Sequence, residues 1–327
     1  MGRFTQGFCE RRATQSGIDP AARHRIISRG WCRSRSAFGA KGITIAAMVS
    51  LNIVGFASGS PLSQMAMARL ARDHRLAAIV GPPPPKALLR RLRQAWRGSS
   101  GPLADLGAPL VDASEVERYK PDVIVVASFP RIIPAATLAT ARIGALNMHA
   151  SALPRHRGID PIFWTYWDDD RDAAMSIHWI NERVDAGDIA AQKSLQLARG
   201  RPSRELYMEL AAIGVELLAG VLGEISRSQM PRQPQDETLA TYESAADMAR
   251  ARIPFARWPA ERVWHVLSGL GDQRSGLVAD ANGQTLANGR ATHYRSTGDV
   301  EPGRIAMGNV TYELHCSDGV VTVERVA

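Results

Sequence analysis

The pattern of apolar and polar residues divides the chain into a part in which strands alternate with helices and a part made of short strands. Apolar runs at 43–49, 76–81 and 122–127 are typical of strands buried on both faces. A Ser-Pro start between the first two runs predicts a helix over 60–75. Strands that alternate with helices predict an α/β fold with a parallel sheet, in which ligands usually bind beyond the carboxyl ends of the strands.

The second half of the chain predicts one long helix followed by a small β domain. Large aliphatic residues recur on one face of 203–225, with Ser203 in the capping position. They are Leu206, Leu210, Ile213, Leu217 and Val221. Residues 226–237 are polar and proline-containing, as linkers are, and 260–267 is expected to be helical. Short strand-like runs then recur with Gly, Asn and Asp between them, which favours a small barrel. They lie near 276–279, 291–294, 304–307, 310–315 and 320–323.

The first 42 residues differ from the rest of the chain. They show no helical or strand periodicity, and they hold nine of the 40 Lys and Arg but only two of the 32 Asp and Glu. We interpret 1–42 as a disordered or mis-started basic extension, with an organelle transit peptide as the alternative. The formal charge of +8 therefore belongs almost entirely to this extension, and the nearly neutral remainder has little bulk attraction for nucleic acid.

Composition narrows the classes of protein to which this chain could belong. A chain of 327 residues with 45% hydrophobic and 22% charged residues is typical of soluble globular proteins. No apolar run approaches the roughly 18 residues of a membrane span. Three cysteines, at positions 9, 32 and 316, argue against a disulfide framework and a cysteine nucleophile, and favour a reducing, cytoplasmic location.

Two cofactor classes lack their sequence signals. No GxGxxG follows the first predicted strand, so a dinucleotide role is not expected. His149 and His156 lack metal-ligand spacing, and His178 has no partner His or Cys nearby in the sequence. We therefore expect no catalytic metal.

The segment 145–191 contains the candidate chemistry. Asn147 and His149 are separated by one residue at the end of an apolar run, so on a strand both side chains leave the same face. An amide donor can stabilise an oxyanion while the imidazole handles a proton near neutral pH. A polar pair that ties down a turn is the alternative. The loop that follows is basic and rich in Pro and Gly, and Asp185 then lies in a turn from which it could orient His149 and raise its pKa, or simply make turn hydrogen bonds.

These residues form a composite motif that resembles the folate-dependent formyltransferases. It reads N-x-H-x-S-x-LP-x-x-RG-x-x-P from Asn147 to Pro161, followed by D-x-G-x-I from Asp185 to Ile189. The resemblance covers most of 43–327. It implies a Rossmann-like catalytic domain at 43–230, a linker at 231–246 and an OB-like C-terminal domain at 247–327.

The resemblance also implies roles for single residues. Asn147, His149 and Asp185 would be catalytic, with 10-formyltetrahydrofolate as the formyl donor and no metal. The folate pocket would be lined by two segments, with these residues: Phe129, Arg131, Ile132, Ile133, Pro134, Asn181, Val184 and Gly187. The side facing the acceptor would contain Ser151, Arg157 and Gly158.

The acceptor is where the chain departs from the methionyl-tRNA formyltransferases of this family. Residues 50–61 read SLNIVGFASGSP where those enzymes have a GTPxFA-like segment, and no Gly-, Arg- and Lys-rich insertion follows soon afterwards. The predicted helix at 87–97 carries four arginines that could contact phosphate, although a solvated helix face explains them as well. The aromatic run at 163–167 is closer to small-molecule enzymes, unless it is core. We therefore favour a small-molecule amine, such as an amino sugar or modified amino acid, over initiator tRNA.

Three alternatives remain open. Initiator Met-tRNA could still be the acceptor, because an OB-like barrel can bind nucleic acid and because 290–304 holds a basic and aromatic cluster. Its members are Arg290, His293, Tyr294, Arg295 and Arg304. Hydrolysis of the formyl folate would use the same three residues with water in place of an amine. A non-catalytic relative that binds folate or a partner is the last alternative.

Overall fold

The computed structural model describes residues 49–81, 103–271, 273–286 and 289–325, and these belong to one compact unit, Ala46–Ala327. The predicted basic extension at 1–42 and the arginine-bearing helix at 87–97 lie outside the described residues. The predicted domain boundaries at 230 and 246 stay predictions, since one hydrophobic cluster contains residues from both sides of them, such as Leu210 and Val266.

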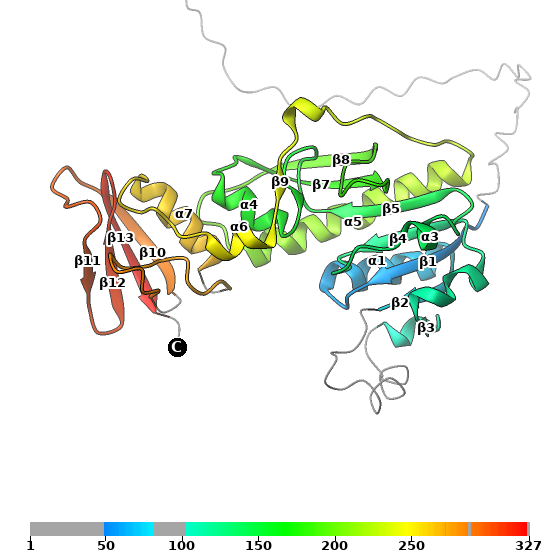
Figure 1. Ribbon diagram of the computed structural model, residues 1–327, viewed down its shortest axis with the longest axis horizontal. Coiled ribbons are helices and arrows are strands. Elements are labelled where there is room, and N and C mark those ends of the chain that lie inside the picture. The colour runs from blue at the N-terminus through cyan, green and yellow to red at the C-terminus, as the bar shows by residue number, and fades with distance from the viewer. Residues whose placement is uncertain (1–48, 82–102, 272, 287–288, 326–327) are drawn as a thin grey trace, which may run out of the picture. The chain divides into compact units, whose positions relative to one another are not determined.

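A seven-stranded sheet forms the centre of the larger part (Figure 1). Its order is β3-β2-β1-β4-β5-β7-β8; the first five strands are parallel, and β7 and β8 are antiparallel to their neighbours. The strands are β1 (Asn52–Ala57), β2 (Arg75–Val80), β3 (Leu110–Val111), β4 (Val123–Ala127), β5 (Gly144–His149), β7 (Asp172–Trp179) and β8 (Ile189–Gln196). This arrangement confirms the predicted α/β, Rossmann-like fold.

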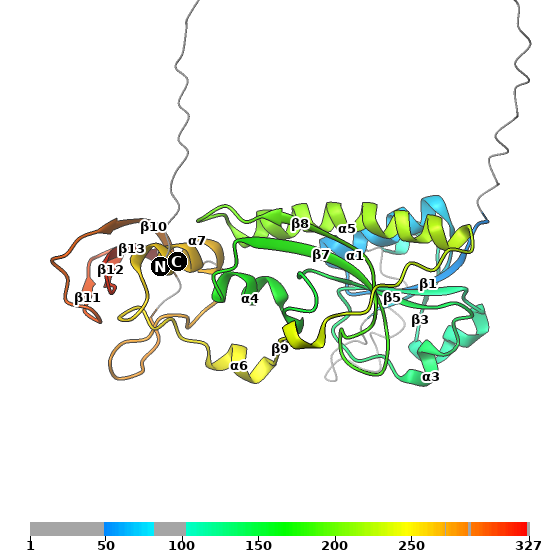
Figure 2. The same cartoon turned by 90° about the horizontal axis from the view of Figure 1, so that it is seen from above.

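Both faces of this sheet are covered, which explains why its strands are almost wholly apolar. Successive residues of β1 point into two different clusters: Ile53 packs with α1 (Pro61–Asp73) and α5 (Ser203–Ser226), whereas Val54 packs on the opposite face. Figure 2 shows α1 and α5 along one side of the sheet and α3 (Ala135–Leu138) on the other. Short 3₁₀ segments complete the cover at η2 (Ala104–Leu106) and η3 (Ala113–Tyr119).

The first described strand begins later in the chain than predicted. We predicted a strand at 43–49, of which 43–48 lies outside the described residues, whereas β1 occupies Asn52–Ala57. Gly59, which follows this strand, has a positive φ of 88°. Gly55 lies inside β1, where a Cβ would come 2.1 Å from Met67 Sδ on α1. A glycine at this position therefore lets the helix pack closely against the sheet. The predicted helix start is confirmed, since the Ser60 side chain accepts a hydrogen bond from the Ser63 amide.

The long helix α5 is a core element. By length and composition it could cross a membrane, with a mean hydropathy of 1.6, but half of that window is buried in the protein. It packs against α1, β7 and β8, so its apolar character is explained by the core. Ser203 is not its cap: Pro202 occupies that position, and the Ser203 hydroxyl is buried without a hydrogen-bond partner.

The C-terminal part is a helix on a small antiparallel sheet. Helix α7 (Ala260–Leu270) packs on β10 (Gly289–Ser296) and β13 (Gly319–Arg325), and the sheet order is β10-β13-β12-β11. The two other strands are β11 (Ile305–Met307) and β12 (Thr311–His315). The predicted strand at 276–279 is only an isolated bridge between Ala279 and Thr285. This sheet is consistent with the predicted small barrel-like domain.

Short elements connect the two parts beside the edge of the large sheet. They are β6 (Arg157–Gly158), α4 (Pro161–Trp167), η4 (Glu237–Leu239), β9 (Tyr242–Glu243) and α6 (Ala245–Arg250). β6 pairs with β9 in parallel, so the linker returns to the loop that follows β5. This contact brings 235–243 next to the residues that the sequence singled out.

Candidate active site

Two side chains of the candidate site come from the end of β5. Asn147 and His149 lie two residues apart near the carboxyl end of β5, which confirms the strand on which the prediction relied. β7 runs antiparallel to β5 and places His178 directly opposite Asn147. The sheet therefore supplies three polar side chains where the parallel strands end.

Asp185 comes from the turn between β7 and β8, and the structure brings its carboxylate to the other three side chains. Oδ1 lies 3.2 Å from Asn147 Nδ2 and 3.4 Å from His178 Nε2, and Oδ2 lies 3.7 Å from His149 Nδ1. The Gly158 amide donates to Oδ2 at 2.8 Å. The predicted convergence of Asn147, His149 and Asp185 is therefore present. Asn147 is within hydrogen-bond distance of Asp185, and His149 is slightly beyond that distance.

The hydrogen-bond partners assign the protons of both imidazoles. His149 Nε2 faces the His156 carbonyl at 2.8 Å, and His178 Nδ1 faces the Trp179 carbonyl at 2.9 Å. A carbonyl only accepts, so each of these nitrogens carries a hydrogen. In the neutral rings, the lone pairs are then on His149 Nδ1 and His178 Nε2. Both of these atoms face Asp185, and His178 Nε2 also accepts from Asn147 Nδ2 at 3.1 Å.

Burial reverses the expected pKa shift of His149. Its side chain is only 7% exposed, and desolvation lowers its pKa more strongly than the nearby Asp185 carboxylate raises it. The expected effect of Asp185 is confirmed, since the carboxylate raises this pKa, but desolvation outweighs it and the net shift is downward. The pKa of Asp185 is itself held far below its ordinary value: burial raises it, but the positive charge that His149 and His178 carry when protonated, together with the Gly158 amide, outweighs burial. The resting site consequently pairs an ionised Asp185 with a neutral His149.

The predicted folate-binding residues lie on two loops, one after β4 and one after β7. Ile132 and Val184, one on each loop, are large apolar side chains with exposed fractions of 86% and 48%. Phe129 and Ile133 pack on the same apolar cluster as Ile180. Arg131, Pro134 and Asn181 are exposed, and the Asn181 side chain accepts from the Arg183 amide. Exposed apolar side chains suit contact with an aromatic ring system.

Gly187 lies in the turn that packs against β7. It is buried, and a Cβ on it would lie 1.8 Å from the Trp179 carbonyl oxygen. The structure therefore requires a glycine for the close approach of the turn to β7, and contact of Gly187 with folate stays a prediction.

The three residues predicted to face the acceptor make contacts within the protein. The Ser151 hydroxyl is buried and donates to the Arg155 carbonyl at 2.8 Å. Gly158 has a φ of 100° and packs against the Glu243 carbonyl, while its amide holds Asp185. The Arg157 side chain is fully buried. Its guanidinium donates to Gln235, Glu237 and Tyr242. These contacts position the site, and the role of the three residues toward an acceptor stays a prediction.

Sequence reasoning missed two residues of this site. The sequence shows His178 only as a histidine without a metal-ligand partner nearby, because the register between β5 and β7 is not readable from the sequence. Gln235 belongs to the polar linker, and its amide donates to the carbonyls of Asp185 and Gly187 at 2.9 and 2.6 Å.

Comparisons with known proteins agree with this geometry. A family profile described as Formyl transferase matches residues 111–222, which includes every catalytic candidate. The methionyl-tRNA formyltransferase of Chlorobium chlorochromatii is 32% identical over 210 residues, 63% of this chain and 66% of that protein. The same enzyme from Syntrophus aciditrophicus is 30% identical over 64% of this chain and 67% of its own length. The relative from Latilactobacillus sakei is 28% identical over 78% of this chain and 82% of its length.

Solved structures share the fold at lower identity. An N-formyltransferase from Helicobacter canadensis, in complex with folinic acid and dTDP-3-aminofucose, has a TM-score of 0.63 at 14% identity and covers 84% of this chain and 99% of its own. HypX from Aquifex aeolicus with tetrahydrofolic acid has a TM-score of 0.58 at 18% identity, over 84% of this chain and 44% of its own. The composite motif, its assembled geometry and these sequence relatives together place this chain in the folate-dependent formyltransferase family.

Proposed function

We propose that the protein transfers a formyl group from 10-formyltetrahydrofolate to a primary amine. One observation carries this proposal: Asn147, His149 and Asp185 converge at the carboxyl end of β5, with a neutral imidazole beside an ionised carboxylate. The same arrangement argues against a non-catalytic relative, because a buried carboxylate between two imidazoles is costly to keep without a use.

The proton positions suggest how the residues act. The amine nitrogen attacks the formyl carbon, a C–N bond forms, and the carbonyl oxygen becomes an oxyanion. His149 Nδ1 takes the proton that the amine loses, and Asp185 stabilises the imidazolium so formed. The bond from the formyl carbon to N10 of the folate then breaks, the carbonyl re-forms, and N10 receives the proton as tetrahydrofolate leaves.

Oxyanion stabilisation by Asn147 requires one exchange of hydrogen bonds. Both N–H groups of its amide have acceptors in this structure, Asp185 Oδ1 at 3.2 Å and His178 Nε2 at 3.1 Å. An amide nitrogen has two donors only, so one of them must turn to the oxyanion. His178 is the partner we expect to be released, since the Asp185 carboxylate is the stronger acceptor.

Two observations support a small-molecule amine as the acceptor. The described loop after β1 lacks the segment expected of the tRNA enzymes, and the charge outside residues 1–42 is nearly balanced. Low net charge gives little long-range attraction for a polyanion. An amino sugar or a modified amino acid is the acceptor class that we propose first, in the cytoplasm.

Initiator Met-tRNA is the second candidate, and two other observations favour it. The sequence relatives described above are methionyl-tRNA formyltransferases. In addition, β10 exposes Arg290, His293, Tyr294 and Arg295 on its surface, and Arg304 is exposed nearby in the chain. Basic and aromatic side chains on an open sheet are a suitable surface for nucleic acid.

The test is release of tetrahydrofolate from 10-formyltetrahydrofolate by the full chain. Parallel reactions contain nucleotide-linked amino sugars, hydroxyornithine, charged initiator Met-tRNA or no acceptor. We expect turnover with an amine that is about 10²–10³-fold slower in Asn147→Ala, because one oxyanion donor is lost. Asn282→Ala, an exposed asparagine in the C-terminal part, is the matched control and should keep the wild-type rate.

Each of these parallel reactions tests a different acceptor. Release with small amines supports the first acceptor class, and release with Met-tRNA alone replaces it with the second. Release without any acceptor would establish the hydrolase instead. If no reaction released tetrahydrofolate, or if Asn147→Ala and wild type reacted at equal rates, the proposed transfer would be contradicted.

A further inference from the structure

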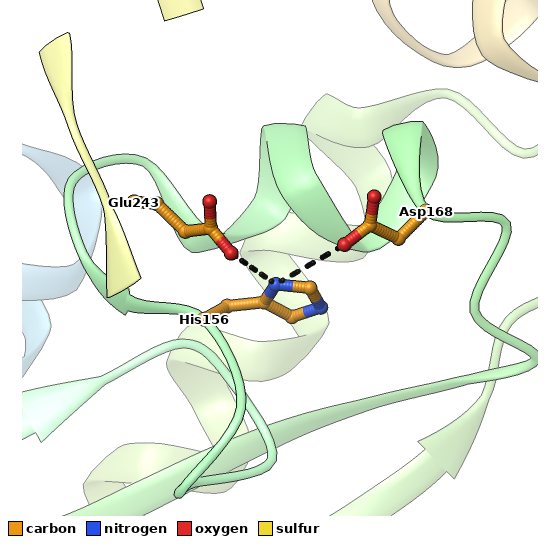
Figure 3. Close-up of side chains that lie close together, drawn as sticks. All are labelled: His156, Asp168 and Glu243. Carbon is orange, nitrogen blue, oxygen red and sulfur yellow. Dashed lines mark hydrogen bonds and ion pairs between the residues drawn. The ribbon is translucent and has the colours of Figure 1, made fainter. Parts of the chain in front are cut away.

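A second cluster of titratable side chains lies beside the candidate active site (Figure 3). It consists of His156 in the loop before β6, Asp168 directly after α4, and Glu243 on β9. The imidazole is 1% exposed, and its Nδ1 lies 3.3 Å from Glu243 Oε1 and 3.8 Å from Asp168 Oδ2. These three potential ligand atoms all lie within 4.8 Å of one another. The proposed formyl transfer uses none of them.

A carboxylate on the far side of the ring fixes the orientation of His156. Nε2 lies 2.8 Å from Asp170 Oδ2, so it donates its hydrogen there and the neutral ring keeps its lone pair on Nδ1. That lone pair faces the space between Asp168 and Glu243, as Figure 3 shows. Histidines that bind metals usually donate their other N–H to a carboxylate in this way.

The charges around His156 also favour a bound cation. Asp170 is neutralised by Arg155 at 2.7 Å. Within the described part of the chain, however, the only cationic partner in the ion pairs of Asp168 and Glu243 is His156. A single N–H at Nδ1 can donate to only one of the two carboxylates. A divalent ion would bind both carboxylates and Nδ1 together.

We propose that His156, Asp168 and Glu243 bind a divalent transition-metal ion, with Zn²⁺ as the best fit. Metal–ligand distances of about 2.0–2.2 Å in a tetrahedron put ligand atoms about 3.3 Å apart, close to the 3.3 and 3.8 Å observed. The imidazole disfavours Ca²⁺ and Mg²⁺, which prefer oxygen ligands. Three protein ligands leave one position for water.

The metal would position the candidate active site without touching the reacting atoms. Its ligands come from three segments, so binding would clamp the loop before β6, the end of α4 and β9 together. The carbonyl of His156 accepts from His149 Nε2 at 2.8 Å, so this clamp would also fix the proton of His149. The inference goes beyond the proposed formyl transfer and holds whichever acceptor is found.

The experiment measures zinc binding to the full chain. Cys9 and Cys32 are changed to serine, because free thiols also bind zinc, and the protein is dialysed against a chelator before calorimetric titration with ZnCl₂. We expect one Zn²⁺ per chain and a higher midpoint of thermal unfolding with zinc. Asp168→Asn and Glu243→Gln should each weaken binding at least tenfold, and Asp170→Asn by about 10–100-fold. Asp172→Asn, an exposed carboxylate four residues from Asp168, should bind as wild type.

Two results would overturn the proposal. One is the absence of stoichiometric zinc binding to the chain in which His156, Asp168 and Glu243 are unchanged, a result that does not depend on how the ligand variants fold. The other is zinc binding that persists in both Asp168→Asn and Glu243→Gln, with circular dichroism showing that both have folded. Binding of MgCl₂ without binding of ZnCl₂ would also contradict the assigned ligand chemistry.

Discussion

At the scale of single residues, burial decides how the proposed active site works. Loss of hydration lowers the pKa of His149 even though Asp185 lies 3.7 Å away. A neutral imidazole whose proton is fixed on Nε2 leaves Nδ1 free to take a proton from the amine. Asp185 then stabilises charge that forms during the reaction, which is where electrostatic stabilisation is most effective.

Asp185→Asn should slow turnover and shift the pH dependence downward. We expect kcat to fall by about 10²–10³-fold, because the imidazolium loses its counter-charge. Protonated His149 cannot accept a proton, so kcat/KM rises with pH through the pKa of His149. That pKa is already below its ordinary value, and Asp185 raises it, so removal of the carboxylate should lower it further. The measurement is a pH–rate profile from pH 4 to 8 for both proteins.

An acid limb that moves to higher pH in Asp185→Asn would contradict this role. Circular dichroism and thermal unfolding at each pH serve as controls, since loss of fold in acid would mimic the limb.

At the scale of elements, close approach of the backbone sets the sequence requirements. β1 and α1 pack so tightly that a Cβ at position 55 would meet Met67 Sδ at 2.1 Å. The same reason places Gly187 against β7. A glycine inside a strand is thus explained by close contact with a neighbouring element, and the local pattern of apolar and polar residues does not show this contact.

Gly55→Ala should destabilise the protein through this contact with α1. Overpacking of a well-packed core usually costs about 1–3 kcal/mol, and we expect a loss of unfolding free energy in that range. The matched test is Met67→Ala, which removes the obstructing sulfur. In the Met67→Ala background, Gly55→Ala should lower the unfolding free energy much less. Urea unfolding of the wild type, the two single variants and the double variant measures this difference. Additive losses would show that Met67 is not the cause.

At the scale of the whole molecule, the linker between the two parts is built into the candidate site. Gln235 holds the carbonyls of the turn that carries Asp185, and Arg157 binds Gln235, Glu237 and Tyr242. The path to the C-terminal part therefore runs through contacts that position the catalytic candidates. A change in the linker should affect the site without touching a substrate.

Two arginines that bind the same carboxylate allow a controlled test of this coupling. Arg157 and Arg183 both contact Glu237 at 3.0 Å, but their side chains are 0% and 59% exposed. Arg157→Ala should lower the unfolding free energy by about 2 kcal/mol, because a fully buried side chain and its charge-assisted hydrogen bonds are lost. Arg183→Ala should change stability little, since exposed ion pairs contribute little. Equal effects in denaturant unfolding would contradict the role given to the buried guanidinium.

The sequence by itself determined the α/β class, most element positions and the three catalytic candidates. Period-two and helical patterns are local, and Asn147 and His149 need only a strand to share a face. The tertiary structure alone decided what depends on distant segments. The register of β5 and β7 added His178, desolvation reversed the expected pKa shift of His149, and the returning linker turned Arg157 inward. The cluster of His156, Asp168 and Glu243 has the same origin, because residues far apart in sequence become neighbours only when the chain folds.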